Sequence, residues 1–228
     1  MNSANANECK QVGNLQELKT LVEQYRDTPV QAAIEELVVL NAKIRKIKGD
    51  GNCFYFSAIF LVLEHFLSGP GTPSQLLDLL QGVNGLLKES GVEEYLIEEF
   101  SDPMFQVVKC ASSREAVDLE ALDSIFWDHT LMYFRMITSA YIKTHRAEFE
   151  GFLEKDLVEY CQAQVEVTNE YADEIELEGF SRAFNISFEI ISICDGQIRK
   201  FIKGESSISI GSLLFTAQHY DIIYCPTE

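Results

Sequence analysis

The run of residues 53 to 67 constrains the fold more than any other feature of the sequence. It is apolar on nearly every side, and a helix with that pattern is stable only when a core surrounds it. The preceding residues, 48 to 52, include two glycines and an aspartate and are typical of a tight turn. We therefore predict a central buried helix that begins at Cys53. Because Glu64 and His65 interrupt the apolar run, it is too short to span a membrane.

The residues before this turn predict a helical arm. Leucines recur at helical spacing through residues 11–27. The pair Thr28-Pro29 suits the N-cap and first position of a second helix, which we expect to continue through about Lys43. We thus expect residues 1–43 to form an N-terminal helical arm with a disordered start, and residues 44–228 to form the main domain.

Helical patterns continue to about residue 170, and short strand-like runs follow. Thr72-Pro73 is a start signal for one helix, and Ser112 with Glu115 has the spacing of a capping box for another. After Gly179 the runs become short and rich in β-branched and aromatic residues. They span residues 186–193, 198–202, 213–215 and 220–224. We predict an α/β (α+β) fold in which a small mixed sheet is packed between helices.

Charge and cysteine content exclude several classes of function. A net charge of −18 argues against nucleic acid as a partner, because phosphate binding requires a concentrated Lys/Arg surface, and a basic protein or peptide fits better. The six cysteines contain no C-x-x-C pair, so we expect neither disulfides nor structural zinc. Residues 1–10 do not have the pattern of a secretory signal, and we expect a cytoplasmic location that can extend to the nucleus.

The residues Asp50-Gly51-Asn52-Cys53 join a glycine-bearing turn to the start of the predicted buried helix. Cys53 would then face the unpaired N–H groups of the first helical turn, which favour a thiolate. The same N–H groups could hold the oxyanion of a tetrahedral intermediate. The alternative, on these residues alone, is an inert buried cysteine after an ordinary turn.

A second candidate element lies near the end of the chain, where residues 218–224 alternate as a strand would. His219 and Asp221 then share one face of the strand, and the carboxylate could reach the imidazole. In a Cys-His-acid arrangement the acid orients the base that deprotonates the thiol. The alternative is a surface histidine beside a solvated aspartate.

Five segments together resemble the ovarian-tumour (OTU) cysteine proteases, and in particular the otubains. The nucleophile motif is similar over residues 50–55 and the terminal histidine strand over residues 219–224. The segments 133–141, 152–166 and 173–184 also resemble otubain patterns, in the expected order. The resemblance covers residues 44 to 225, and coincidence in so many separate segments is improbable.

The resemblance implies a function and a role for each matching residue. Cys53 would be the nucleophile, His219 the general base and Asp221 the orienting acid. Asp50 would contribute its backbone to an oxyanion loop that includes Gly51 and Asn52. Residues 44–228 would be an OTU catalytic domain with a papain-like fold, which hydrolyses the isopeptide bond after the C-terminal glycine of ubiquitin through a thioester. Ubiquitin, polyubiquitin chains and ubiquitin-conjugating enzymes are the implied partners, with no metal or cofactor.

The sequence departs from the family at Phe56, where an arginine is usual, and at Gln218, where glycine is frequent. Glu174 and Glu176 stand where related otubains can have histidines. These two and Asp173 belong to an acidic stretch, which we expect to bind the arginine-bearing tail of ubiquitin; the alternative is a solvated charge run.

Two further functions stay open. One is a non-catalytic regulator that binds ubiquitin and conjugating enzymes, and the other is a peptidase for a ubiquitin-like modifier.

Overall fold

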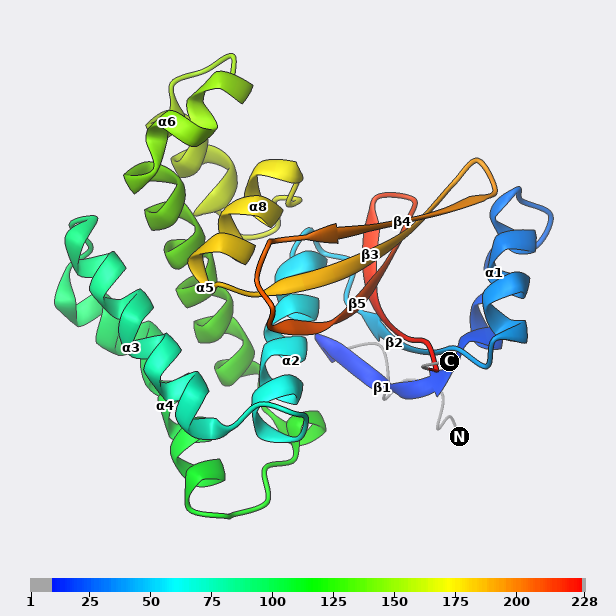
Figure 1. Cartoon of the computed structure of the whole chain (residues 1–228), viewed down its shortest axis with the longest axis horizontal. Coiled ribbons are helices and arrows are strands. Elements are labelled where there is room, and N and C mark those ends of the chain that lie inside the picture. The colour runs from blue at the N-terminus through cyan, green and yellow to red at the C-terminus, as the bar shows by residue number, and fades with distance from the viewer. Residues whose placement is uncertain (1–9, 227–228) are drawn as a thin grey trace, which may run out of the picture.

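The computed structural model describes residues 10–226 as a layer of helices, a central helix and a six-stranded sheet (Figure 1). The sheet order is β1-β2-β6-β5-β3-β4, and it is mixed because β3 and β5 are parallel while the other pairs are antiparallel. The strands are β1 (Val12–Glu17), β2 (Lys43–Ile47), β3 (Ser187–Cys194), β4 (Gln197–Lys203), β5 (Ser209–Thr216) and β6 (His219–Tyr224). The longer helices are α1 (Val30–Val39), α2 (Cys53–Leu67), α3 (Pro73–Glu89), α4 (Glu94–Ser112), α5 (Ser124–Thr144) and α8 (Glu174–Ala183). The shorter ones include α6 (Arg146–Phe149), α7 (Leu157–Tyr160) and a π-helical turn (Cys161–Val165).

The central buried helix is confirmed. Every residue of α2 from Cys53 to Leu63 is buried, and the helix lies between the other helices and one face of the sheet. Phe54 makes edge-on contact with Phe180 of α8, at a ring-centroid distance of 5.4 Å. α1 covers the opposite face of the sheet through a separate apolar cluster. The sheet is therefore packed between helices, as predicted. None of the helices described over residues 10–226 is long and apolar enough to cross a membrane.

The start signal at Thr72 is also confirmed, but the one at Ser112 is wrong. Thr72 and Gln75 form a capping box at the first turn of α3. Ser112 instead ends α4, where its hydroxyl donates to the carbonyl of Val108 in the preceding turn. No helix begins there, so its spacing to Glu115 has no structural role as a cap.

The predicted helix over residues 11–27 is wrong. Residues 12–17 form β1, which pairs antiparallel with β2 in the register Val12 to Ile47 and Gln16 to Ile44. The backbone hydrogen bonds offered by β2 outweigh a leucine spacing that is weak as a helix signal. The second predicted helix exists as α1, but its predicted bounds are wrong: Pro29, not Thr28, is the N-cap, and the helix ends at Val39, because Lys43 already begins β2. Residues 1–9 lie outside the described residues, and a boundary after residue 43 stays a prediction.

Candidate active site

Gly51 lets the chain turn into α2. Its φ of +88° lies in the left-handed region, and a Cβ built on it would lie 2.2 Å from the backbone oxygen of Asn169, so only glycine fits. The carboxylate of Asp50 accepts hydrogen bonds from the backbone N–H and the side-chain amide of Asn52, at 3.1 and 3.0 Å, and forms an ion pair with Lys48. The predicted turn is confirmed. The side chain of Asp50 stabilises this turn. The resemblance implied a different contribution, that of the Asp50 backbone to the oxyanion loop.

Cys53 is the first residue of α2, and its side chain is buried. The side chain of the preceding residue, Asn52, makes no capping bond to this helix. The N–H groups of the first turn therefore have no partner within the helix, and they point the positive end of its dipole toward the thiol. N–H groups in this position can stabilise the oxyanion of a tetrahedral intermediate.

A two-residue hairpin between β5 and β6 presents His219. Ala217 and Gln218 both have positive φ, 49° and 64°, as a type I′ turn requires. Nε2 of His219 lies 3.1 Å from Oδ1 of Asp221, and the same oxygen accepts the backbone N–H of Ile47 at 2.8 Å. Asp221 is buried, so it is not a solvated surface aspartate.

The imidazole of His219 joins this carboxylate to the thiol of Cys53. Burial alone would lower the pKa of His219, but its hydrogen bonds to Asp221 and Cys53, together with their charges, raise that pKa to about 10. Because Nε2 faces Asp221, Nδ1 is the nitrogen left for the thiol. The raised pKa favours an imidazolium at His219, beside the thiol of Cys53.

Arg135 supports the nucleophile loop, a role that the sequence reasoning missed. It projects from α5, is completely buried, and donates from Nη2 to the side-chain carbonyl of Asn52 at 2.8 Å. It also donates to the backbone carbonyls of Gln164, Val165 and Glu170, at 3.4, 3.0 and 2.8 Å. The guanidinium also stacks over the ring of Tyr55, 4.4 Å from the centroid. The sequence feature that could have revealed this role is a single arginine in the otherwise apolar segment 133–137.

Asn52 and Asn169 form a second unpredicted link in this loop. The side-chain amide of Asn52 donates to the side-chain oxygen of Asn169, and the backbone N–H of Asn169 donates back to Asn52, both at 2.9 Å. Asn52 thus uses its whole side chain to tie the nucleophile loop to the loop before α8. Phe56, where the family usually has arginine, packs instead against Trp127, with a ring-centroid distance of 5.9 Å.

The acidic residues of α8 differ in their exposure. Glu176 is buried and accepts hydrogen bonds from the Tyr160 hydroxyl at 2.6 Å and from the backbone N–H of Asp173 at 2.9 Å. It completes the capping box of α8, so it lacks the exposure that a contact with a ubiquitin tail requires. Asp173 and Glu174 are exposed, and Glu174 pairs with Lys203. Their role in tail binding stays a prediction.

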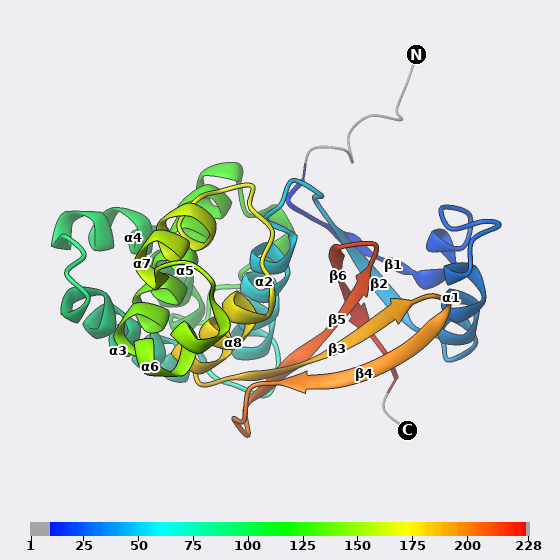
Figure 2. The same cartoon turned by 90° about the horizontal axis from the view of Figure 1, so that it is seen from above.

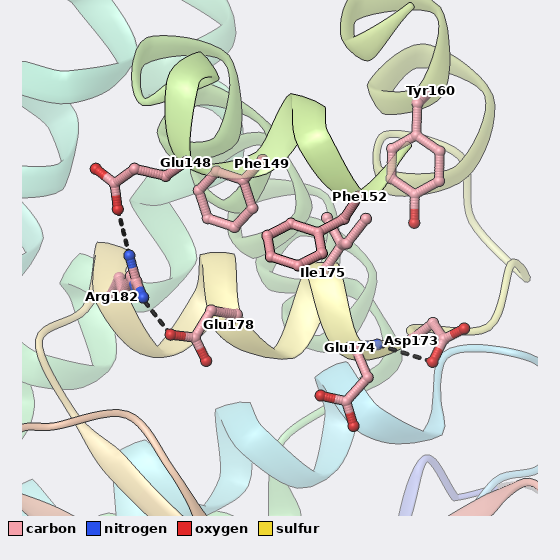
Figure 3. Close-up of a pocket in the computed structure, with 9 residues that line it drawn as sticks. All are labelled: Glu148, Phe149, Phe152, Tyr160, Asp173, Glu174, Ile175, Glu178 and Arg182. Carbon is pink, nitrogen blue, oxygen red and sulfur yellow. Dashed lines mark hydrogen bonds and ion pairs between the residues drawn. The ribbon is translucent and has the colours of Figure 1, made fainter. Parts of the chain in front are cut away.

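Asp173 and Glu174 line a cavity of about 420 Å³ beside α8 (Figure 3). Aromatic side chains face it from the chain after α5, with Phe149 and Phe152 next to each other above α8. Phe152 is 80% exposed, so its ring contributes apolar surface to the cavity. The cavity is therefore partly apolar and has acidic residues at its rim.

Papain-like cysteine peptidases use a cysteine, a histidine and an acidic or amide residue arranged as Cys53, His219 and Asp221 are here, on a sheet packed between helices. The fold and the site place the chain in that class. The described cysteines are all free, and residues 10–226 contain no cluster of His, Cys, Asp or Glu that could hold a metal ion.

The chain belongs to the otubains: the family model for peptidase C65, Otubain, matches residues 4–225. Ubiquitin thioesterase OTUB2 of Mus musculus is 30% identical over 207 residues, which cover 85% of this chain and 86% of that relative. Ubiquitin thioesterase OTUB1 of Homo sapiens is 30% identical over 222 residues, which cover 91% of this chain and 80% of that relative. The fold is similar to that of h/ceOTUB1 in a solved complex with ubiquitin aldehyde and UBC13~Ub, with a TM-score of 0.85, 22% identity and coverage of 97% and 93%. The OTU resemblance inferred from the motifs is confirmed.

Proposed function

We propose that this protein is a deubiquitinase, which hydrolyses the isopeptide bond after the C-terminal glycine of ubiquitin in polyubiquitin or in ubiquitin conjugates. The observation that carries the proposal is the placement of Cys53 at the start of α2 beside His219 of β6, whose imidazole is hydrogen-bonded to Asp221. The relatives named above are ubiquitin thioesterases. The intact series favours hydrolysis, because a protein that only binds ubiquitin has no chemical need of all three groups.

The geometry supports a two-step reaction that uses only groups of the chain and water. The Cys53 thiolate attacks the glycine carbonyl, and N–H groups at the start of α2 stabilise the oxyanion. His219 gives its proton to the leaving amine as the C–N bond breaks, which leaves a thioester on Cys53. A water molecule then attacks the thioester while His219 takes its proton, and the thiolate is released. Asp221 orients the imidazole and stabilises its charge in both steps.

The cavity beside α8 is the docking surface that we assign to ubiquitin. α8 lies beside the start of α2, because Phe180 of α8 packs against Phe54. An apolar surface of ubiquitin would cover the exposed ring of Phe152, and its arginine-bearing tail would pass Asp173 and Glu174 on the way to Cys53.

A second candidate function is binding without catalysis. Solved complexes hold h/ceOTUB1 with ubiquitin aldehyde and UBC13~Ub or UBCH5B~Ub, so ubiquitin-conjugating enzymes are proposed partners of this chain as well. A third candidate is hydrolysis at the tail of a ubiquitin-like modifier, since the same catalytic series would serve it.

One experiment separates the three candidates. Ubiquitin and ubiquitin-like modifiers, each with a thiol-reactive C-terminal group, are incubated with the protein, and linkage-defined diubiquitins are tested for cleavage in parallel. We expect a ubiquitin adduct on Cys53 and cleavage of at least one linkage. Cys53→Ala should abolish both while retaining ubiquitin binding, and Cys110→Ala, a change at an exposed cysteine of α4, should retain both activities. Binding without adduct or cleavage would favour the regulator, and an adduct with another modifier alone would favour the third candidate.

A further inference from the structure

Positive charge is concentrated beside the active site of this strongly acidic chain. The net charge is −18, yet four of the six residues from 43 to 48 are basic. They are Lys43, Arg45, Lys46 and Lys48. Lys46 and Lys48 line a cavity of about 480 Å³ together with Lys10, which precedes β1. Three lysines around one cavity are unexpected where acidic residues outnumber basic ones 36 to 18.

Two of these lysines have no carboxylate partner among the described residues. Nζ of Lys10 donates to the backbone carbonyl of Glu120, and Nζ of Lys46 donates to the side-chain amide oxygen of Gln24 at 3.0 Å, both neutral acceptors. Over residues 10–226 neither lysine has an ion pair. Lys48 is paired with Asp50 of the nucleophile loop. The cavity is therefore positive overall.

The cavity lies on the His219 side of the active site. Gly49 lines it, and a Cβ built on Gly49 would lie 3.7 Å from Nδ1 and Cε1 of His219. Ile47, also in its lining, donates its N–H to Asp221. In Figures 1 and 2, α8 lies on one side of α2 and the strands β1 and β2 lie on the other. The elements that contribute to the two cavities, α8 on one side and β1 with β2 on the other, thus lie on opposite sides of α2, the helix that begins at Cys53.

The chemistry assigns a different part of the substrate to each side. His219 protonates the leaving amine, so the leaving polypeptide departs next to the imidazole, while the acyl part stays on Cys53. Lysines on an edge strand can simply prevent edge-to-edge pairing, but Lys46 is on β2, which β1 and β6 enclose. Edge protection therefore does not account for the charge of Lys46.

We propose that the cavity of Lys10, Lys46 and Lys48 receives the leaving polypeptide and favours one in which acidic residues flank the modified lysine. The inference rests on the proposed function and adds to it a class of substrate. Opposite charge raises the rate of encounter and holds the acceptor segment near His219, and salt weakens both effects. Each exposed contact contributes little by itself, so the expected preference is moderate, about three- to tenfold in kcat/KM at low salt.

The test uses ubiquitin joined through an isopeptide bond to the central lysine of three synthetic peptides, with acidic, neutral or basic flanks. The parent should cleave the acidic substrate fastest, and the preference should shrink at high salt. In Lys10→Gln/Lys46→Gln the ratio of acidic to neutral kcat/KM should fall toward one. The control, Lys109→Gln/Lys200→Gln, removes the same charge from exposed positions on α4 and β4 and should keep the parent ratio. In Lys46→Glu the preference should move toward the basic peptide.

The outcomes separate this proposal from the one on which it rests. Ubiquitin with a small coumarin leaving group tests hydrolysis itself, and failure of the parent to release coumarin would contradict the proposed function. Coumarin release combined with equal rates on all three peptides at low salt would overturn only the leaving-group proposal. A preference for the acidic peptide that is unchanged in Lys10→Gln/Lys46→Gln would also overturn the leaving-group proposal.

Discussion

The guanidinium of Arg135 is hydrogen-bonded to the side-chain carbonyl of Asn52, the residue immediately before Cys53, at 2.8 Å. A fully buried cation on α5 thereby holds the loop that delivers the nucleophile. Burial lowers the pKa of this guanidinium, but an arginine stays charged in proteins. Its charge is dispersed over carbonyl groups from three segments, and those groups lose their donor if it is removed.

The first prediction follows from that network. Arg135→Met should lower the free energy of unfolding by about 3–5 kcal/mol, because buried acceptors are left unpaired, and kcat should fall as the nucleophile loop loses its support. Urea denaturation and steady-state kinetics measure both. Arg182→Met, at an exposed ion-paired arginine of α8, is the control and should cost at most about 1 kcal/mol. If the two variants had equal free energies of unfolding, the structural role assigned to Arg135 would be wrong.

The second prediction concerns the turn before Cys53. Gly51→Ala should destabilise the protein by more than about 2 kcal/mol. The new Cβ would collide with the backbone of Asn169, and the alanine would have to keep a positive φ. Gly85→Ala, in α3, meets no atom within 4 Å and should stabilise it by about 0.5–1 kcal/mol. Thermal unfolding of both variants provides the comparison, and a neutral Gly51→Ala would show that the loop can relax.

The third prediction is a graded loss of turnover. His219→Ala should be nearly as damaging as Cys53→Ala, because His219 is the base beside the thiol. Asp221→Ala should leave measurable activity, since it orients the base without exchanging a proton with the substrate. Initial rates on a ubiquitin substrate give the order. If both variants kept full turnover, the assignment of this pair would be untenable.

The fourth prediction is a pH dependence of stability. The pKa of His219 is raised to about 10 in the folded state, whereas it is about 6.5 in an unfolded chain. The folded state therefore binds the extra proton, and this stabilisation is fully present below the unfolded pKa and is lost as pH rises toward the folded one. Denaturation at about pH 6, 8 and 10 should show the parent losing stability relative to His219→Gln. A constant difference would contradict the raised pKa.

The fifth prediction distinguishes two neighbouring glutamates of α8. Glu176→Ala should lower the free energy of unfolding by about 1–3 kcal/mol, because the Tyr160 hydroxyl and a backbone N–H lose their acceptor. Glu174→Gln, at an exposed position, should change stability by less than about 0.5 kcal/mol. It should instead raise KM for ubiquitin substrates at low salt, with a smaller effect at high salt. If KM at low salt were unchanged, Glu174 would not contribute to binding of the ubiquitin tail.

Local sequence patterns were sufficient for the parts of the site that lie close together in the chain. The apolar run after Cys53 predicted α2, because a helix without a polar face has to be buried. The glycine at position 51 predicted the turn, since the required φ is open to few other residues. Strand alternation placed His219 and Asp221 on one face, and their hydrogen bond follows from a spacing of two residues.

Only the tertiary structure decided which distant segments support these residues. Asn52 is joined to Arg135 and Asn169 across 83 and 117 residues of chain, and no local pattern encodes such pairs. The strand at residues 12–17 depends on the hydrogen bonds offered by β2, which overrode its leucine spacing. The physical reason is the same in each case: the free energy of a buried hydrogen bond or strand pair depends on a partner that folding brings into contact, whereas the sequence specifies directly only the preferences of neighbours along the chain.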